Sequence, residues 1–114
     1  MVEKTVKIAV AALEDKKASD VKVLKIENIT TLASYFVICN GTSTTQVRAL
    51  ADECEFKLEQ NGIKINHREG KPDGGWVLLD YADVIIHIYT PEARKFYDLE
   101  RFWQDAAEID VNAL

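Results

Sequence analysis

Hydrophobic and polar residues alternate along residues 76–89 in the way expected of a tight antiparallel β-hairpin. Two β-rich segments flank a short polar turn at Tyr81 and Ala82. If Asp80 pairs with Asp83 across this turn, alternate side chains of both strands share a face. One face is then wholly aliphatic and consists of Val77, Leu79, Val84, Ile86 and Ile88. We expect this face to lie in the hydrophobic core.

The opposite face of the hairpin carries aromatic rings and an imidazole. It consists of Trp76, Leu78, Ile85, His87 and Tyr89. Trp and Tyr are enriched at protein interfaces because each combines a large apolar ring with a polar edge. We therefore expect this face to bind a partner, although a core position suits Trp76 equally well. For His87 a hydrogen-bonded structural or interface role is favoured over catalysis or a pH switch, because no nucleophile is placed near it by the sequence.

The N-terminal part of the chain has the pattern of one helix followed by two strands. Residues 2–14 repeat apolar positions with the helical period, which predicts an amphipathic helix. In residues 21–26 the alternation slips, which indicates either a strand covered on both faces or a bulge near Val23. Residues 35–39 form an uninterrupted apolar run, which is typical of a central strand buried on both faces.

A second helix is predicted after the central strand. Ser43 and Gln46 have the spacing of a capping box, and Asn61-Gly62 is a typical helix end. The positions expected to be buried in this helix are Val47, Leu50, Ala51, Cys54 and Leu58. A strand is expected next at residues 63–67, and the strand-helix-strand order predicts a right-handed parallel crossover.

The remaining segments are predicted to be loops and one helix. Residues 69–75 hold three of the five glycines and one of the two prolines, which predicts a flexible loop. Pro91 should start the last helix, and residues 106–114 should fray. The apolar residues of this helix expected to pack on the body are Phe96, Leu99, Phe102 and Trp103. The whole pattern predicts a single α/β (α+β) domain over residues 1–114, with a mixed β-sheet flanked by helices.

Composition and charge narrow the possible partners. With 47% hydrophobic and 29% charged residues the chain is an ordinary globular protein and not a disordered one. The 14 Lys and Arg against 19 Asp and Glu give a net charge of −5, so a basic protein suits it better as a partner than nucleic acid does. No apolar run approaches the roughly 20 residues of a membrane span, and the N-terminus lacks the features of a signal peptide. These features predict a cytoplasmic protein without membrane contact.

The cysteines and histidines give no sign of a metal or cofactor site. Cys39 and Cys54 both lie in apolar patterns and are expected to be reduced, buried thiols. His67 and His87 stand alone in the sequence, and no second cysteine pair accompanies them. We therefore expect neither a metal nor a cofactor.

The turn Gly41-Thr42-Ser43 and the side chain of Arg94 each allow two interpretations. Phosphate could bind at the helix that follows the turn, but a single glycine without a following Lys favours a simple helix cap. A nucleotidyltransferase would carry two metal-binding acids on the next strand, and residues 63–67 contain none. Arg94 could anchor a partner carboxylate or pair with a neighbouring acid of the same chain.

Several blocks follow one another between about Asp20 and Asp105. They are Tyr35-Phe36-Val37-Ile38, Gly41-Thr42-Ser43, Gln46-Val47, Glu69-Gly70, Trp76-Val77-Leu78-Leu79-Asp80-Tyr81, Asp83-Val84-Ile85-Ile86-His87 and Arg94-Lys95-Phe96-Tyr97-Asp98-Leu99-Glu100-Arg101-Phe102-Trp103. In this order they resemble the ribosomal silencing factor family, also called the Iojap-like family. Two positions depart from the family pattern: Ser34, where Asp is usual, and Ala82, where Gly is commoner.

The resemblance implies a non-enzymatic protein with a nucleotidyltransferase-like layout that lacks the catalytic acids. Such proteins bind the large ribosomal subunit through its protein number fourteen, block joining of the small subunit and repress translation, and they tend to form homodimers. The residues expected to bind the partner are Glu69, Trp76, Leu78, Asp80, His87, Tyr89 and Arg94. Acidic side chains would orient a basic ribosomal protein, and aromatic ones would supply most of the affinity. The alternative is a small nucleotidyltransferase-like enzyme that uses the Gly41-Thr42-Ser43 turn.

Overall fold

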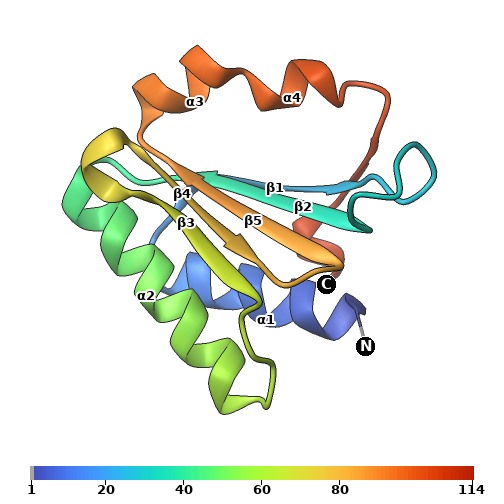
Figure 1. The fold of residues 1–114 in the computed structure, drawn as a ribbon, viewed down its shortest axis with the longest axis horizontal. Coiled ribbons are helices and arrows are strands. Elements are labelled where there is room, and N and C mark those ends of the chain that lie inside the picture. The colour runs from blue at the N-terminus through green and yellow to red at the C-terminus, as the bar shows by residue number, and fades with distance from the viewer. Residues whose placement is uncertain (1) are drawn as a thin grey trace.

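A mixed six-stranded sheet organises the molecule, with helices on both of its faces (Figure 1). The computed structural model describes residues 2–114. Across the sheet the strands follow the order β3-β4-β5-β2-β1-β6. Their bounds are β1 Ser19–Lys25, β2 Tyr35–Asn40, β3 His67–Lys71, β4 Trp76–Asp80, β5 Val84–Tyr89 and β6 Ala107–Ile109. The strands β2 and β5 are parallel and the other neighbouring pairs are antiparallel, so the expected mixed sheet is confirmed.

The helices form two layers around this sheet. The long helices α1 (Val2–Asp15) and α2 (Thr44–Gln60) cover one face, and the short helices α3 (Pro91–Tyr97) and α4 (Leu99–Phe102) lie over the other (Figure 1). Two short 3₁₀ helices, η1 at Pro72–Gly74 and η2 at Val111–Ala113, complete the secondary structure. The predicted N-terminal helix and the second helix are both confirmed within one or two residues at their ends.

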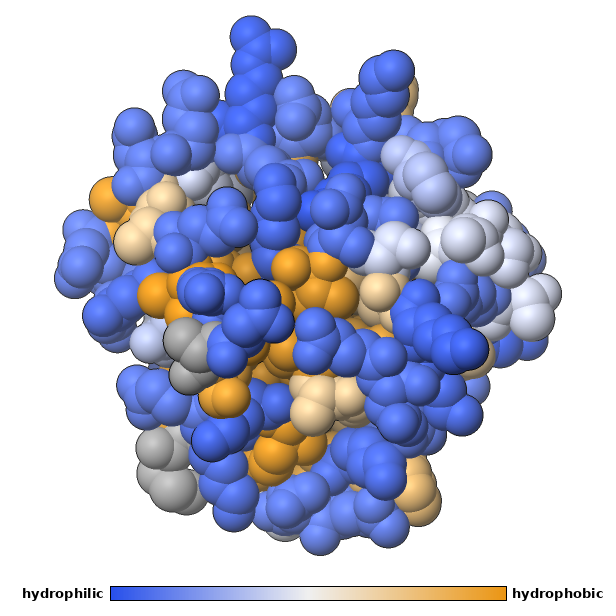
Figure 2. Space-filling view, turned by 180° about the vertical axis from the view of Figure 1, so that it is seen from behind, coloured by the Kyte–Doolittle hydropathy of each residue, from blue (hydrophilic) through white to orange (hydrophobic). Residues whose placement is uncertain are grey.

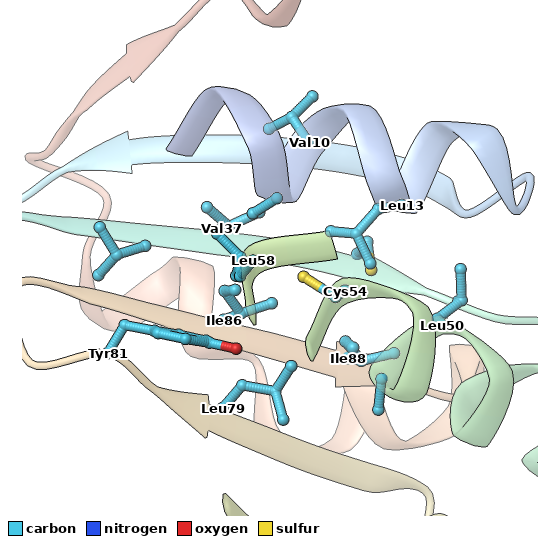
Figure 3. Packing of buried hydrophobic residues seen from close by; sticks show 14 of the residues in the cluster. Val10, Leu13, Val37, Leu50, Cys54, Leu58, Leu79, Tyr81, Ile86 and Ile88 are labelled. Atoms are coloured by element: carbon cyan, nitrogen blue, oxygen red, sulfur yellow. The ribbon is translucent and has the colours of Figure 1, made fainter. Parts of the chain in front are cut away.

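The main core lies between the sheet and the two long helices. Figure 3 shows Val10 and Leu13 of α1 and Leu58 of α2 directed toward the strand residues Val37 and Ile86. All the α2 positions predicted to be buried, Val47, Leu50, Ala51, Cys54 and Leu58, are 0% exposed. The aliphatic face of the hairpin, Val77, Leu79, Val84, Ile86 and Ile88, belongs to the same cluster. Both expectations are therefore confirmed.

The central strand β2 is buried on both faces, as its uninterrupted apolar pattern predicted. On one side of β2 Val37 faces the long helices, and on the other Phe36 faces α4. In β1 both faces are likewise covered, and the register shift lies between Ser19 and Lys22. The thiols Cys39 and Cys54 are free and buried, as expected. Burial raises the pKa of Cys39 to about 12, so this thiol stays protonated and unreactive.

The register of the hairpin differs from the prediction by two residues. Asp80 pairs with Ile85, and not with Asp83, because the connection between the strands contains three residues. Within it, Ala82 takes a positive φ of 67°, and the ring of Tyr81 turns into the core, where Figure 3 shows its hydroxyl directed inward. The carbonyl of Asp83 accepts hydrogen bonds from the backbone N–H groups of Ser34 and Tyr35. Because side chains repeat with a period of two, the shift leaves every side chain on its predicted face.

The prediction of a strand at 63–67 with a parallel crossover is wrong. The strand after α2 is β3, His67–Lys71, and it pairs antiparallel with β4 at the edge of the sheet. All five β3 residues are exposed, and three of them are charged, which suits an edge strand better than a central one. The parallel neighbour of β2 is instead β5, whose residues are all buried.

Two segments predicted to be a loop and a frayed end instead contain regular secondary structure, so these assignments are wrong. Much of the supposed loop 69–75 belongs to β3 and η1. Gly70 has a φ of +83°, and an added Cβ would collide with the backbone carbonyl oxygen of Trp76, so the sequence uses glycine there to pack two strands. Within 106–114, β6 pairs with β1, and Val111 packs against the main core.

The predicted final helix is broken into two. Asp98 adopts the left-handed conformation, with φ 46° and ψ 47°, and separates α3 from α4. Leu99 and Trp103 pack onto the sheet as predicted, but Phe96 is 80% exposed because the break changes the helical phase. The side chain of Phe102 lies outside the described part of the structure.

The C-terminal strand lies at the side of the molecule that faces away from the viewer in Figure 1. Figure 2 shows that side directly. Hydrophobic residues come to the surface there in several patches separated by hydrophilic side chains. The short strand β6 is the edge of the sheet at this side, opposite the edge formed by β3, and it pairs with β1.

Candidate partner-binding surface

The outer face of β3 and β4 is covered only in part by the short helices. Strand register places Glu69 beside Leu78, Lys71 beside Trp76, and His67 beside Asp80, all on this face. The packing of Leu99, Trp103 and Ala106 is directed instead at the cluster over β5, β2 and β1. Trp76 and Leu78 remain half-buried, so their apolar surface is available to a partner. We call Glu69, Trp76, Leu78, Asp80 and Tyr97 the β3–β4 surface.

The rings of two buried residues, His87 and Tyr89, lie beside the ring of Trp76 in nearly parallel planes. The rings of Trp76 and His87 are 6.1 Å apart at an interplanar angle of 6°. The ring of Tyr89 lies 6.0 Å from that of Trp76 and 6.1 Å from that of His87, so the three rings form a triangle. The indole Nε1 of Trp76 also donates a hydrogen bond to Nδ1 of His87, at 3.3 Å. Trp76 is therefore held by the core on one side and open on the other.

His87 and Tyr89 lie beneath this surface and not on it. Their side chains are 5% and 2% exposed, because the rings of Phe36, Trp76 and Tyr97 pack around them. The sequence pattern correctly placed them on the same face of the sheet as Trp76. This face is covered over β5 and only partly covered over β4, which the pattern does not show. The two residues can influence a partner only through the rings that they support.

The imidazole of His87 is held in its neutral form. Burial lowers its pKa to about 4. Since Nδ1 accepts the indole hydrogen bond, the neutral ring carries its proton on Nε2, which is buried without a hydrogen-bond partner among the described residues. A general base needs access to substrate and a pKa near the working pH, and His87 has neither. Its geometry fits the structural role that the sequence favoured.

The two acids of the surface differ in how free they are. Glu69 is exposed, and its carboxylate lies 3.5 Å from Nε2 of His67. Asp80 is half-buried, and its Oδ1 accepts a hydrogen bond of 2.7 Å from the backbone N–H of Ala82. The carboxylate of Asp80 therefore stabilises the hairpin connection, whereas that of Glu69 is open to a partner.

Arg94 lies away from these residues and is engaged within the chain. Its guanidinium donates two hydrogen bonds to the carboxylate of Glu100, at 2.9 and 3.2 Å. The side chain of Arg94 is only 10% exposed. Of the two interpretations of Arg94, the structure shows the pairing with an acid of the same chain.

Sequence reasoning missed Tyr97. Its ring is 46% exposed and lies 5.5 Å from the ring of Trp76, so it extends the aromatic part of the surface. The neighbouring Phe96 is also exposed, and its ring packs edge to face against Tyr97. The signal in the sequence was the pair of adjacent aromatic residues in one helix, because neighbouring positions cannot both face the core.

The Gly41-Thr42-Ser43 turn is used entirely as a helix cap. The hydroxyl of Ser43 accepts a hydrogen bond from the backbone N–H of Gln46. The amide oxygen of Gln46 reaches back to the backbone N–H and hydroxyl of Thr42, at 2.6 and 2.9 Å. This is a capping box displaced by one residue. The backbone N–H and hydroxyl of Thr42 and the hydroxyl of Ser43 are thus engaged within the protein, which supports the cap over a nucleotide site.

Over residues 2–114 no three His, Cys, Asp or Glu side chains are grouped so that they could hold a metal ion. In the same range, none of the helices has the length and hydropathy that crossing a bilayer requires.

Comparison with known proteins points to one family. The family model described as "Ribosomal silencing factor during starvation" matches residues 1–114. The chain is 42% identical over 106 residues to the ribosomal silencing factor RsfS of Bacillus subtilis, which covers 93% of this chain and 90% of that protein. A crystal structure of a protein from Chromobacterium violaceum superposes with a TM-score of 0.88 at 36% identity, over 91% of this chain and 87% of that one.

A more distant relative has a name that mentions the large subunit. The mouse protein "Mitochondrial assembly of ribosomal large subunit protein 1" is 31% identical over 100 residues. The match covers 82% of this chain and 42% of the mouse protein.

Proposed function

Because the chain belongs to the ribosomal silencing factor family, we propose that it binds the large ribosomal subunit and represses translation. In this proposal it binds protein number fourteen of that subunit and blocks joining of the small subunit. Binding and steric obstruction are sufficient for this role, and no chemical step is required. The protein would act in the cytoplasm and would form homodimers when it is not bound.

The observation that carries the proposal is the β3–β4 surface. It combines half-buried aromatic and aliphatic side chains, Trp76 and Leu78, with an exposed acid, Glu69. Hot spots of protein interfaces have this composition, with aromatic anchors surrounded by polar groups that exclude water. The ring of Trp76 is also held rigidly by its hydrogen bond to His87, which lowers the entropy lost on binding.

Charge favours a basic protein as the partner. The net charge of −5 and the exposed carboxylate of Glu69 would attract a basic surface and speed its encounter. The same charge opposes direct binding to ribosomal RNA, because few phosphates could be neutralised. A basic ribosomal protein at the surface of the large subunit satisfies both requirements.

Co-sedimentation with isolated large subunits tests the proposal. Wild-type protein should pellet with large subunits saturably and should prevent them from joining small subunits in a gradient. Trp76→Ala should abolish both effects. Phe56→Ala is the matched control, because Phe56 is an aromatic residue 54% exposed on α2, at the opposite face of the sheet. Absence of saturable binding, or equal loss with both variants, would refute the proposal.

A further inference from the structure

Arg94 occupies the centre of a polar network that joins three separate parts of the chain. Its Nη1 donates to the side-chain oxygen of Asn40, at 2.7 Å, and to the backbone oxygen of Asp20, at 2.8 Å. Its Nε and Nη2 bind the two carboxylate oxygens of Glu100. Lys22 adds a second cation, with its Nζ 3.0 Å from Glu100 Oε2. All three guanidinium nitrogens are thus used inside the protein, which leaves Arg94 poorly placed to contact a partner.

The network joins the two helices, α3 and α4, across the break that separates them. Arg94 belongs to α3 and Glu100 to α4, and the left-handed residue Asp98 lies between them. A residue other than glycine is strained in this conformation, so the surrounding contacts must hold it there. Two parallel hydrogen bonds between guanidinium and carboxylate fix both distance and orientation. The pair therefore fixes α3 relative to α4, and the bonds of Arg94 to Asp20 and Asn40 connect α3 to the sheet.

The same end of the sheet carries the exposed part of the β3–β4 surface. Asn40 at the end of β2 pairs with Tyr89 of β5, and Tyr89 pairs with Trp76 of β4. Tyr97, three residues after Arg94 on α3, lies 6.0 Å from the ring of Tyr89 and 5.5 Å from that of Trp76. The position of the exposed Tyr97 ring thus depends on where α3 is held.

The ion pair remains formed over a wide pH range. Hydrogen bonding to Arg94, and more weakly to Lys22, lowers the pKa of Glu100 to about 2. Its carboxylate is therefore charged at any pH at which the protein would meet a partner.

We propose that Arg94 is a positioning residue of the partner-binding surface. Its guanidinium fixes α3 against the ends of β1 and β2, and α3 in turn holds Tyr97 beside Trp76. The predicted effect of Arg94 on partner binding rests on the proposed function, whereas its predicted effect on the positions of the Tyr97 and Trp76 rings does not. The two parts of the proposal can therefore be tested separately.

The positioning of the rings is tested without any partner. The chain has two Trp residues, so 5-fluorotryptophan labelling gives two ¹⁹F resonances, and Trp76→Phe identifies the one from Trp76. Arg94→Gln should shift or broaden the Trp76 resonance. Arg94→Lys should do the same, because an ammonium group keeps the charge but cannot form the fork. Arg68→Gln is the matched control, since Arg68 bridges Asp52 and Glu55 of α2 on the other face of the sheet.

A double-mutant cycle tests the effect on binding. In the wild-type background, Arg94→Gln should weaken affinity for large subunits about tenfold. In a Tyr97→Ala background, the same substitution should weaken affinity by less than about twofold, because both substitutions act through the ring of Tyr97. Should Arg94→Gln not fold, Glu100→Gln removes the same fork from its other end. An unchanged Trp76 resonance with additive losses of affinity would overturn the proposal and make Arg94 a direct contact. If the wild type binds no subunits but Arg94→Gln still changes the Trp76 resonance, only the proposed function would be refuted.

Discussion

Trp76 and His87 form a diagonal pair across β4 and β5, joined by the hydrogen bond from Nε1 to Nδ1 at 3.3 Å. Strand register sets Leu78, not Trp76, directly opposite His87. The hydrogen bond therefore ties together neighbouring rungs of the ladder, and it connects a buried residue with a half-exposed one. Through this pair, the packing of the core determines how the indole is presented at the surface.

Replacing Trp76 by Ala should impair partner binding more than folding. The indole is only half-buried, whereas truncation of an aromatic anchor typically costs ~2–4 kcal/mol of binding energy. Affinity for large subunits and the thermal unfolding midpoint should be measured on one preparation. A collapsed midpoint with normal binding by the remaining folded protein would assign Trp76 to the core instead.

The buried His87 should make stability depend on pH. Its pKa is about 4 in the folded protein, against an ordinary value of 6.5, so the unfolded chain binds more protons between these values. The stabilisation is complete above pH 6.5 and is lost as the pH falls toward 4. The difference corresponds to about 3 kcal/mol.

The measurement is urea unfolding from pH 7.5 to 4, comparing wild type with His87→Gln. Carboxylates also titrate in this range, so the difference between the two proteins isolates His87. His67→Gln serves as the control, because His67 is exposed on the edge strand β3. Parallel pH profiles of wild type and His87→Gln would contradict the prediction.

Sequence patterns succeeded where burial alone determines structure. The aliphatic face of the hairpin and the buried face of α2 follow directly from hydrophobic periodicity, and both are confirmed. The two-residue error in the hairpin register arose because the number of residues in the connection depends on the inward turn of Tyr81 and the positive φ of Ala82. Neither feature has a periodic signal.

Long-range packing explains the other errors. Whether a strand after α2 pairs with β2 or lies at the edge depends on competition with β5, which a local pattern does not express. For the candidate surface, the alternation of side chains along the strand correctly placed Trp76 and Leu78 on one face of the sheet. It could not show that His87 is buried, or that Tyr97 of α3 lies beside Trp76.

Reversing the charge of Glu69 should slow association with the partner. Glu69→Lys places a cation where a basic protein is expected to approach, and its exposed position predicts little effect on stability. Because exposed charges are screened over about 10 Å at 0.1 M salt, the difference from wild type should shrink as salt rises. Stopped-flow association at several salt concentrations measures this. Asp80 is less suited to the test, since its replacement also removes the hydrogen bond to Ala82.

A loss of affinity that does not change with salt would contradict the electrostatic explanation for Glu69. Glu59→Lys provides the matched control, because Glu59 is an exposed acid near the end of α2, on the other side of the sheet. It alters the net charge equally. Similar effects from both substitutions would show that overall charge, and not this surface, directs the encounter.

Replacing Ser43 by Ala separates the binding role from the enzymatic alternative. The Ser43 hydroxyl accepts a hydrogen bond of 3.1 Å from the backbone N–H of Gln46, and removing such a cap costs ~1 kcal/mol. In a domain of this size that lowers the melting temperature by a few degrees, roughly 4–8 °C. Affinity for large subunits should stay near that of wild type, because α2 covers the face of the sheet opposite the β3–β4 surface.

The same preparations should be titrated with nucleotide and Mg²⁺ in a calorimeter. If the Gly41-Thr42-Ser43 turn were a phosphate site, wild type would bind nucleotide saturably and Ser43→Ala would abolish it with little change in melting temperature. The structure favours the opposite result, because Gln46 already occupies the backbone N–H and hydroxyl of Thr42. A ligand phosphate would have to displace this side chain, which also donates to the backbone oxygens of Lys16 and Lys17 and thereby joins α2 to the end of α1.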